Sequence, residues 1–182
     1  MRRILFLFLL GLFLGNCTNQ GSPASNEQKG QDLHLEKTTK SMRDTTPRVT
    51  GIGGIFFRST DPSKSKAWYG ENLGLAIDPY GSVFEFRNAV DPGQINYLRW
   101  SPFEENTEYF NPSEKDFMIN YRVQNIEGLV KNLRDKQVTI LDEIQEFEYG
   151  KFVHILDPEG NKIELWEPND EFLTQMGGET TK

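Results

Sequence analysis

Several side chains in this sequence have the chemistry of a binding or catalytic site. Arg58, Arg99 and Arg122 lie in aromatic and aliphatic stretches, where a sheet interior is expected. A guanidinium group binds a carboxylate or phosphate with two parallel hydrogen bonds, and it also stacks on aromatic rings. His154 and Glu164 have the side chains of an acid/base pair. Together these residues suit a pocket for a planar or anionic small molecule.

The alternation of side chains along β-strands decides which of these residues can meet. Successive residues of a strand point to opposite faces of its sheet. In the predicted strands, this alternation places a mostly polar set of side chains on one face of the sheet. His154 lies on the same side of its strand as Phe152. The candidate catalytic residues are His154 and Glu164, and the predicted ligand-binding residues are Arg58, Tyr97, Arg99, Asn120, Arg122 and Trp166.

A second interpretation of the arginines stays open. Arginines inside a folded sheet cannot remain unpaired without a large desolvation cost. Glu164 and His154 would then satisfy the arginines, for example through an Arg–Glu164 ion pair. Structural ion pairs perturb pKa values just as functional sites do. The sequence favours neither ligand contact nor internal pairing.

The elements that position these residues are marked by capping and turn signals. A β-branched and aromatic strand is expected near 51–59, followed by a helix that Asp61 caps and Pro62 opens. Asn125 precedes a second helix, whose apolar residues recur at helical spacing. Short strands are expected near 138–144, 151–156 and 162–166. The stretch 101–116 is long for a connection, and it is either a lid or a joining segment.

The two halves of this region resemble each other. Residues 55–61 align with 119–125 at an offset of 64, and each half is expected to contain a strand, a helix and three strands. An internal repeat of this kind indicates a duplicated structural unit. The predicted fold class is therefore α+β, built from two βαβββ units.

Two motifs carry a resemblance to a known family. The second half closes on Asp-Pro-Glu-Gly-Asn-Lys-Ile-Glu-Leu at 157–165, and the first opens with Asp61-Pro62 and continues through Trp68-Tyr69 to Leu73-Gly74-Leu75. The region 49–168 resembles the glyoxalase/bleomycin-resistance/dioxygenase superfamily, also called the vicinal oxygen chelate (VOC) superfamily. The resemblance implies an eight-stranded, cup-shaped mixed sheet with helices outside and the ligand inside. It also implies that a homodimer is one available assembly. Residues 169–182 are expected to form a flexible tail.

The same resemblance implies where a metal would lie. Metal-binding members hold a divalent ion with four His, Glu or Gln side chains, and the matching positions here are Gly54, Tyr97, Met118 and Glu164. Of these four residues only Glu164 is a good ligand for a hard ion. One ligand is too few for a tight site, so Glu164 is only a weak metal candidate. We therefore expect no cofactor, and we disfavour a divalent metal without excluding it.

The N-terminal residues resemble an export signal. Two arginines precede an apolar run at 4–14, which is about half the length of a membrane-spanning helix. Leu14-Gly15-Asn16-Cys17 resembles a bacterial lipobox, with Asn16 in a place where a smaller residue is usual. This predicts a signal peptide at 1–16, palmitate or a similar lipid on Cys17, and location at the bacterial cell envelope. The polar stretch 17–48 is expected to be a disordered tether.

Composition excludes some functions. The 182 residues include 20 Lys and Arg against 27 Asp and Glu, for a formal charge of −7, which argues against nucleic acid as a partner. The single cysteine excludes an intrachain disulfide and a multi-cysteine metal site.

Three functions remain after these exclusions. The first is a metal-independent module that binds a small anionic or aromatic molecule. The second is a lyase, isomerase or dioxygenase-related enzyme that uses Glu164 and His154. The third is an interaction protein that uses the fold as a scaffold, which a cup filled by its own side chains would favour.

Overall fold

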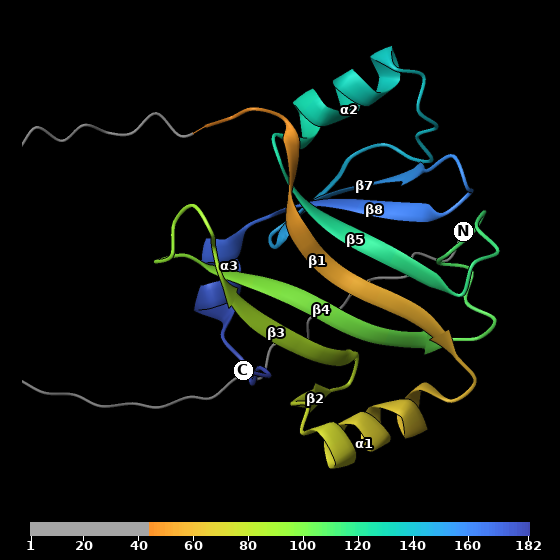
Figure 1. The fold of residues 1–182 in the computed structure, drawn as a ribbon, viewed down its shortest axis with the longest axis vertical. Helices are drawn as coiled ribbons and strands as arrows, with labels where there is room; N and C mark the ends of the chain where they lie inside the picture. The colour runs from red at the N-terminus through yellow and green to blue at the C-terminus, as the bar shows by residue number, and fades with distance from the viewer. Residues whose placement is uncertain (1–43) are drawn as a thin grey trace, which may run out of the picture. The chain divides into compact units, whose positions relative to one another are not determined.

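The computed structural model describes residues 44–182, which form a mixed sheet and three helices (Figure 1). The predicted signal peptide, Cys17 and most of the predicted tether lie outside the described residues. The eight strands lie in the order β2-β3-β4-β1-β5-β8-β7-β6. The first unit contains β1 (Arg48–Ser59), α1 (Pro62–Leu73), β2 (Ile77–Asp78), β3 (Gly81–Arg87) and β4 (Ile95–Glu104). The second contains β5 (Phe117–Gln124), α2 (Ile126–Asp135), β6 (Gln145–Phe147), β7 (Gly150–Leu156) and β8 (Lys162–Pro168), and α3 (Asp170–Met176) follows it.

The strand pairing repeats between the two units. In the first unit β1 runs parallel to β4, with Ile55 opposite Trp100, and in the second β5 runs parallel to β8, with Ile119 opposite Ile163. The two units meet where β1 and β5 pair in antiparallel fashion at the centre of the sheet. The predicted α+β fold of two βαβββ units is therefore confirmed.

Helices α1 and α2 begin at the predicted caps. The Asp61 side chain accepts a hydrogen bond from the Lys64 amide at 3.0 Å, and the Asn125 side chain accepts one from the Gly128 amide at 3.0 Å. Below α2 lies an apolar cluster in which Ile126 and Val130 of the helix meet sheet residues. The buried sheet residues of this cluster are Val123, Val153, Ile155 and Leu165.

The face of the sheet opposite this cluster is called the inner face below. It carries Asn120 and Arg122 of β5, His154 of β7, and Glu164 and Trp166 of β8, which alternate along each strand with residues that pack beneath α2. The alternation predicted this division correctly for both βαβββ units. In the first unit, Trp100 packs against Phe57 and Tyr69 on the helix side.

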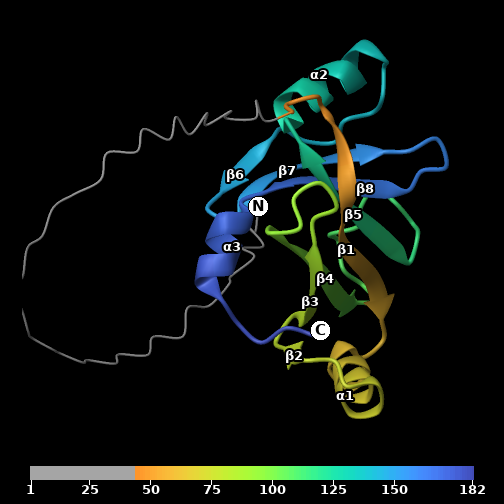
Figure 2. The same cartoon turned by 60° about the vertical axis from the view of Figure 1, so that its left-hand side comes forward.

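The structure differs from the expected flexible tail at 169–182. The Asn169 side chain accepts a hydrogen bond from the Phe172 amide at 3.2 Å and begins α3, whose Leu173 is buried. Figure 2 shows α3 on the other side of the sheet from α1. Beyond the helix, the Thr181 amide donates to the Val83 carbonyl at 2.8 Å, along the edge of β3. The tail is ordered because its caps and backbone groups find partners on both units.

The strand expected near 138–144 is also different. Only Ile140 forms a bridge there, opposite Ile155, and the strand β6 begins later, at Gln145. The pairing of this segment with β7 stops there because the His154 amide donates its hydrogen bond to the Asp142 side chain, at 2.8 Å, and not to a backbone carbonyl. Among the described helices, none is both long and apolar enough to cross a membrane.

Candidate functional site

Glu164 lies at the centre of a buried polar cluster on the inner face. Its residue is 3% exposed, and Asn120 is its neighbour on β5. The Asn120 side-chain amide donates to Oε1 of Glu164 at 2.7 Å, and His154 Nε2 lies 3.0 Å from Oε2. The Tyr109 hydroxyl also donates to Oε2. Both carboxylate oxygens are therefore occupied by protein groups.

His154 connects two carboxylates. Its Nδ1 lies 2.6 Å from Oδ2 of Asp142, while its Nε2 faces Glu164. Burial lowers the pKa of His154, but the hydrogen bonds to Asp142 and Glu164 outweigh burial and raise the pKa above its ordinary value. The arrangement favours a protonated imidazolium, which donates from both ring nitrogens. The structure thus brings the two candidate catalytic residues into contact.

The partners of His154 hold the cluster in a defined charge state. Burial alone would raise the pKa of Glu164, yet the hydrogen bond and charge of His154, together with Tyr109 and Asn120, lower it. Burial raises the pKa of the Tyr109 hydroxyl well above 10, and the charge of Glu164 adds to this. Burial lowers the pKa of Lys162. Glu164 is therefore a carboxylate that accepts hydrogen bonds, and Tyr109 is a donor.

The loop at residues 105–116 covers this cluster. The Tyr109 ring stacks on Phe103, with the ring centroids 5.3 Å apart and the planes at 2°, and its edge-to-face contact with His154 spans 5.6 Å. The Lys162 ammonium donates to the Tyr109 carbonyl at 2.6 Å and lies over the Tyr109 ring. Next to Tyr109, Phe110 is fully buried with Phe56 and Met118. The inner face of this structure is thus filled by the protein's own side chains.

The structure does not bring the three predicted arginines to one pocket. Arg58 donates to the Glu105 carbonyl at 2.6 Å and lies over the Phe110 ring. Arg99 binds both oxygens of Asp78, at 2.5 and 2.6 Å, and Arg122 pairs with Asp170 at 2.5 Å. In this structure Arg99 and Arg122 are paired with Asp78 and Asp170, and not with the suggested Glu164. The carboxylates come instead from β2 and α3, which have no periodic pattern in the sequence.

The other predicted ligand-binding residues also contact protein groups. Tyr97 donates its hydroxyl to Thr174 of α3 at 3.1 Å. The Trp166 indole donates to the Tyr149 carbonyl at 3.2 Å, its ring stacks on Phe152, and Arg122 lies over it at 5.3 Å. Asn120 and Trp166 therefore border the Glu164 cluster and the Arg122 pair, respectively.

Gly53 allows these side chains to come close to β1. It lies at an irregularity in the register between β1 and β5. A Cβ atom added there would lie 2.2 Å from Oδ1 of Asn120 and 2.7 Å from the Trp166 ring. Gly53 is thus required by close packing against the site.

The positions implied for a metal do not fit a divalent ion. Gly54 has no side chain, Met118 is buried against Phe56 and Phe110, and Tyr97 is turned to Thr174. Both oxygens of Glu164 already accept hydrogen bonds. Within residues 44–182, no cluster of three or more His, Cys, Asp or Glu side chains could hold a metal ion. We therefore derive no chemistry through a metal.

An open hollow of about 630 Å³ is lined mainly by residues of the covering loop. Its lining includes Arg58, Glu105, Ser113 and Asp116, so His154 and Glu164 do not contribute to it.

Sequence reasoning missed several residues of these networks, among them Asp78, which gave no signal on its two-residue strand. Tyr109 had a partial signal, because the aromatic loop that carries it is longer than a simple connection. Asp170 had one too, since Asn169 followed by two acidic residues is a helix start. Asp142 gave no signal, because its role depends on where the irregular segment 139–144 meets β7.

Comparison with known proteins supports the fold. No protein-family model and no curated protein matches this sequence. Two variants of methylmalonyl-CoA epimerase from Streptomyces coelicolor, each in complex with 2-nitronate-propionyl-CoA, match with TM-scores of 0.51 and 0.50. Each is 15% identical, and the alignment covers 67% of this chain and 99% of that chain.

A glyoxalase/bleomycin resistance protein/dioxygenase superfamily member from Vibrio splendidus 12B01 also matches. Its TM-score is 0.40 at 14% identity, over 67% of this chain and 99% of that chain. Together with the strand order, the epimerase comparison leads to one conclusion: residues 44–182 have the glyoxalase-like (VOC) fold of two βαβββ units.

Proposed function

We propose that this protein is a lipid-anchored envelope protein whose VOC-like domain binds a small aromatic or anionic molecule on the inner face, without a tight metal site. The anchor is the lipid expected on Cys17, and the protein faces an extracytoplasmic compartment. The bound molecule lies against Glu164, where the Tyr109 side chain lies in the structure described here.

The observation that carries this proposal is the set of charged residues beneath Tyr109. Glu164, His154 and Lys162 are 3%, 7% and 8% exposed. Burying charges is costly, and replacing such groups by apolar residues is often neutral or stabilising. Clusters of buried titratable groups with perturbed pKa values are enriched at functional sites. An aromatic ring with a hydroxyl donor already fits over Glu164, because Tyr109 supplies one.

The filled inner face is the feature that favours the scaffold interpretation instead. Phe110, Met118 and Phe56 fill part of the face with apolar atoms, as a scaffold would. Over Glu164, however, the filling side chain belongs to a loop and is only partly buried, and it covers charged groups as well as packing against this apolar cluster. We therefore infer that Tyr109 is a displaceable cover over a binding site.

Thermal unfolding with a panel of aromatic and anionic metabolites tests this proposal. A ligand at 100 times its Kd stabilises the folded protein by about 2.7 kcal/mol, which is a clear rise in Tm. We expect at least one hydroxyl- or amine-bearing aromatic compound to raise the Tm. The rise should be larger in Tyr109→Ala, because the competing side chain is gone.

The matched control is Glu108→Ala, which alters the same loop at an exposed side chain. Its response to each compound should equal that of the unaltered protein. If no compound stabilises either the unaltered protein or Tyr109→Ala, the binding proposal is wrong and the scaffold function gains support.

A second candidate function is an acid/base enzyme, which the 3.0 Å contact between His154 and Glu164 favours. His154 would hold the transferred proton, with Asp142 orienting its ring. We expect activity of this kind to be lost in both His154→Gln and Glu164→Gln. Elemental analysis is the companion measurement, because stoichiometric metal that disappears in Glu164→Ala would support a metal-dependent enzyme.

A further inference from the structure

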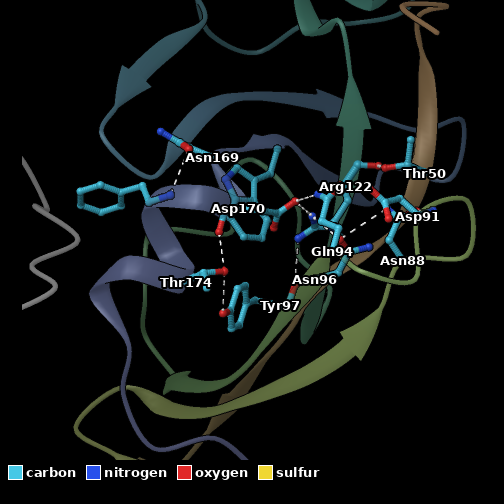
Figure 3. A network of polar contacts seen from close by, with 12 residues as sticks. Thr50, Asn88, Asp91, Gln94, Asn96, Tyr97, Arg122, Asn169, Asp170 and Thr174 are labelled. Carbon is cyan, nitrogen blue, oxygen red and sulfur yellow. Dashed lines mark hydrogen bonds and ion pairs between the residues drawn. The ribbon is translucent and has the colours of Figure 1, made fainter. Parts of the chain in front are cut away.

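The inner face carries a second buried charged group beside the Glu164 cluster. Arg122 is 4% exposed, and its Nη2 lies 2.5 Å from Oδ2 of Asp170, the first residue of α3. Figure 3 shows the two side chains facing each other, with Asn96 and Gln94 beside them. Nη1 of Arg122 donates to the Tyr97 carbonyl at 3.1 Å, and Gln94 donates to the same Asp170 oxygen at 2.7 Å.

The pairing of Arg122 with Asp170 is incomplete. Nε of Arg122 and Oδ1 of Asp170 are buried, and neither has a hydrogen-bond partner among residues 44–182. The same sheet contains a complete pair for comparison, since Arg99 engages both oxygens of Asp78. Two parallel hydrogen bonds are the preferred geometry between a guanidinium and a carboxylate. A carboxylate that is free to turn could therefore satisfy Arg122 better than Asp170 does.

The two partners differ in how they are held. Arg122 lies on the central strand β5, with the Trp166 ring beneath its guanidinium at 5.3 Å. Asp170 lies on a seven-residue helix at the end of the last strand. The contacts that hold this helix include those of buried Leu173, of the Thr174 hydroxyl that meets Tyr97, and of the Asn169 side chain that donates to the Glu148 carbonyl. Displacing Asp170 therefore requires movement of a peripheral element, while the cation stays in place.

The register sets the spacing between the backbone positions of Arg122 and the Glu164 cluster, and from there the guanidinium reaches Asn96 and Tyr97 of β4. Asn120 lies opposite Glu164, and Arg122 lies opposite Trp166, so the two sites are one two-residue repeat apart on the same strands. Such a repeat is about 7 Å long.

We infer that Arg122 binds the carboxylate of the ligand, and that Asp170 occupies this position in the structure described here. The inference rests on the proposed function. It narrows the ligand class to hydroxyaromatic carboxylates: the hydroxyl replaces that of Tyr109 at Glu164, and the carboxylate replaces that of Asp170 at Arg122. The protein thus supplies both groups from its own chain when no ligand is bound.

Calorimetric titration of the full chain with 4-hydroxybenzoate and with 4-hydroxybenzamide tests the inference without any substitution. The two probes differ only in the charge of the group that meets Arg122. We expect the acid to bind at least tenfold more tightly than the amide. Equal affinity, or tighter binding of the amide, would overturn the Arg122 assignment while leaving the proposed site at Glu164 intact.

The Asp170→Asn variant provides a second test, because it removes the competing negative charge at nearly constant shape. We expect the affinity for 4-hydroxybenzoate to rise at least tenfold and the affinity for the amide to stay the same. Glu171→Gln is the control, since it makes the same change on an exposed neighbour in α3 and should leave both affinities unchanged. An unchanged affinity for the acid in Asp170→Asn would also overturn the assignment.

The outcomes separate this inference from the proposed function. If neither probe binds while other panel compounds stabilise Tyr109→Ala, the ligand class is wrong and the site at Glu164 stands. If neither probe binds and the panel also fails, both are wrong. Circular dichroism checks that Asp170→Asn is folded. If it is not, the comparison of the acid with the amide on the unaltered protein tests the Arg122 assignment by itself.

Discussion

At the residue scale, the position of His154 between two carboxylates makes stability depend on pH. The pKa of His154 is raised in the folded protein. Its contribution to the stability of the fold is therefore fully present below about pH 6.5 and is lost as the pH rises through the folded pKa. The pKa values of Glu164 and Asp142 are lowered, so their contributions are present above their ordinary values and are lost as the pH falls. The network is therefore strongest in mildly acidic solution.

The corresponding prediction concerns His154→Gln. Above pH 6.5 the Tm of the unaltered protein should fall with rising pH, while that of His154→Gln should fall less, because the titrating group is gone. Tm measured from pH 5 to pH 9 checks this. Parallel curves for the two proteins above pH 6.5 would show that His154 does not titrate as the contacts require.

A second prediction at this scale concerns the hydroxyl of Tyr109. Tyr109→Phe removes one donor from buried Glu164 and keeps the ring, so the free energy of unfolding should fall by about 1–3 kcal/mol. Urea denaturation measures this change. Tyr80→Phe is the control, because its residue is 40% exposed, and its effect should stay within about 0.5 kcal/mol. Equal effects of the two substitutions would contradict the hydrogen bond to Glu164.

The sequence predicts the meeting of His154 and Glu164 but not the partners of the arginines. Strand alternation alone places His154 and Glu164 on one face, and their strands pair directly. Arg99 and Arg122 are long side chains that reach carboxylates on other elements. Asp78 lies on a two-residue strand and Asp170 on a short terminal helix, so no periodicity in the sequence marks either as a partner.

At the element scale, side chains of the inner face pack directly against the backbone of the central strand β1 at Gly53. Gly53→Ala should lower the free energy of unfolding by about 1–3 kcal/mol, because the added methyl group meets Asn120, Trp166 and Arg122 in a packed interior. Gly51→Ala is the matched control on the same strand, where the nearest side-chain atom lies 3.9 Å away. Chemical denaturation compares the two variants, and equal stabilities would contradict the close approach at Gly53.

Sequence reasoning at this scale works best where caps and periodicity agree. Asp61 and Asn125 identify the starts of α1 and α2, and the alternating strands of the second unit appear near their expected positions. The strand predicted near 138–144 is wrong because the Asp142 side chain replaces a backbone hydrogen-bond partner, and no local sequence pattern shows this. The flexible tail predicted at 169–182 is wrong for another reason. The polar composition of α3 conceals the helix start signal at Asn169.

At the scale of the whole molecule, the duplication is the property that the sequence expresses most clearly. Each unit pairs its first strand with its last, and the two first strands join the units into one sheet. Nothing in the duplicated pattern indicates that the loop after β4 and the C-terminal helix cover the inner face. Both covers lie outside the repeated elements, so their placement depends on tertiary contacts.

The remaining prediction concerns the lipid anchor. Cells that express the full chain and grow with labelled palmitate should label the unaltered protein but not Cys17→Ala, since the thiol of Cys17 is the proposed acceptor of the lipid. Ser22→Ala, in the same polar stretch, should keep the label. Label retained in Cys17→Ala would remove the membrane tether from the proposed function.

The most direct test of the central proposal is a crystal structure of the protein with a compound that raises its Tm. We predict that the compound lies on the inner face, with a polar group against Glu164 and with Tyr109 turned away. A compound bound elsewhere, with Tyr109 still bonded to Glu164, would contradict the proposal that this loop covers a ligand site.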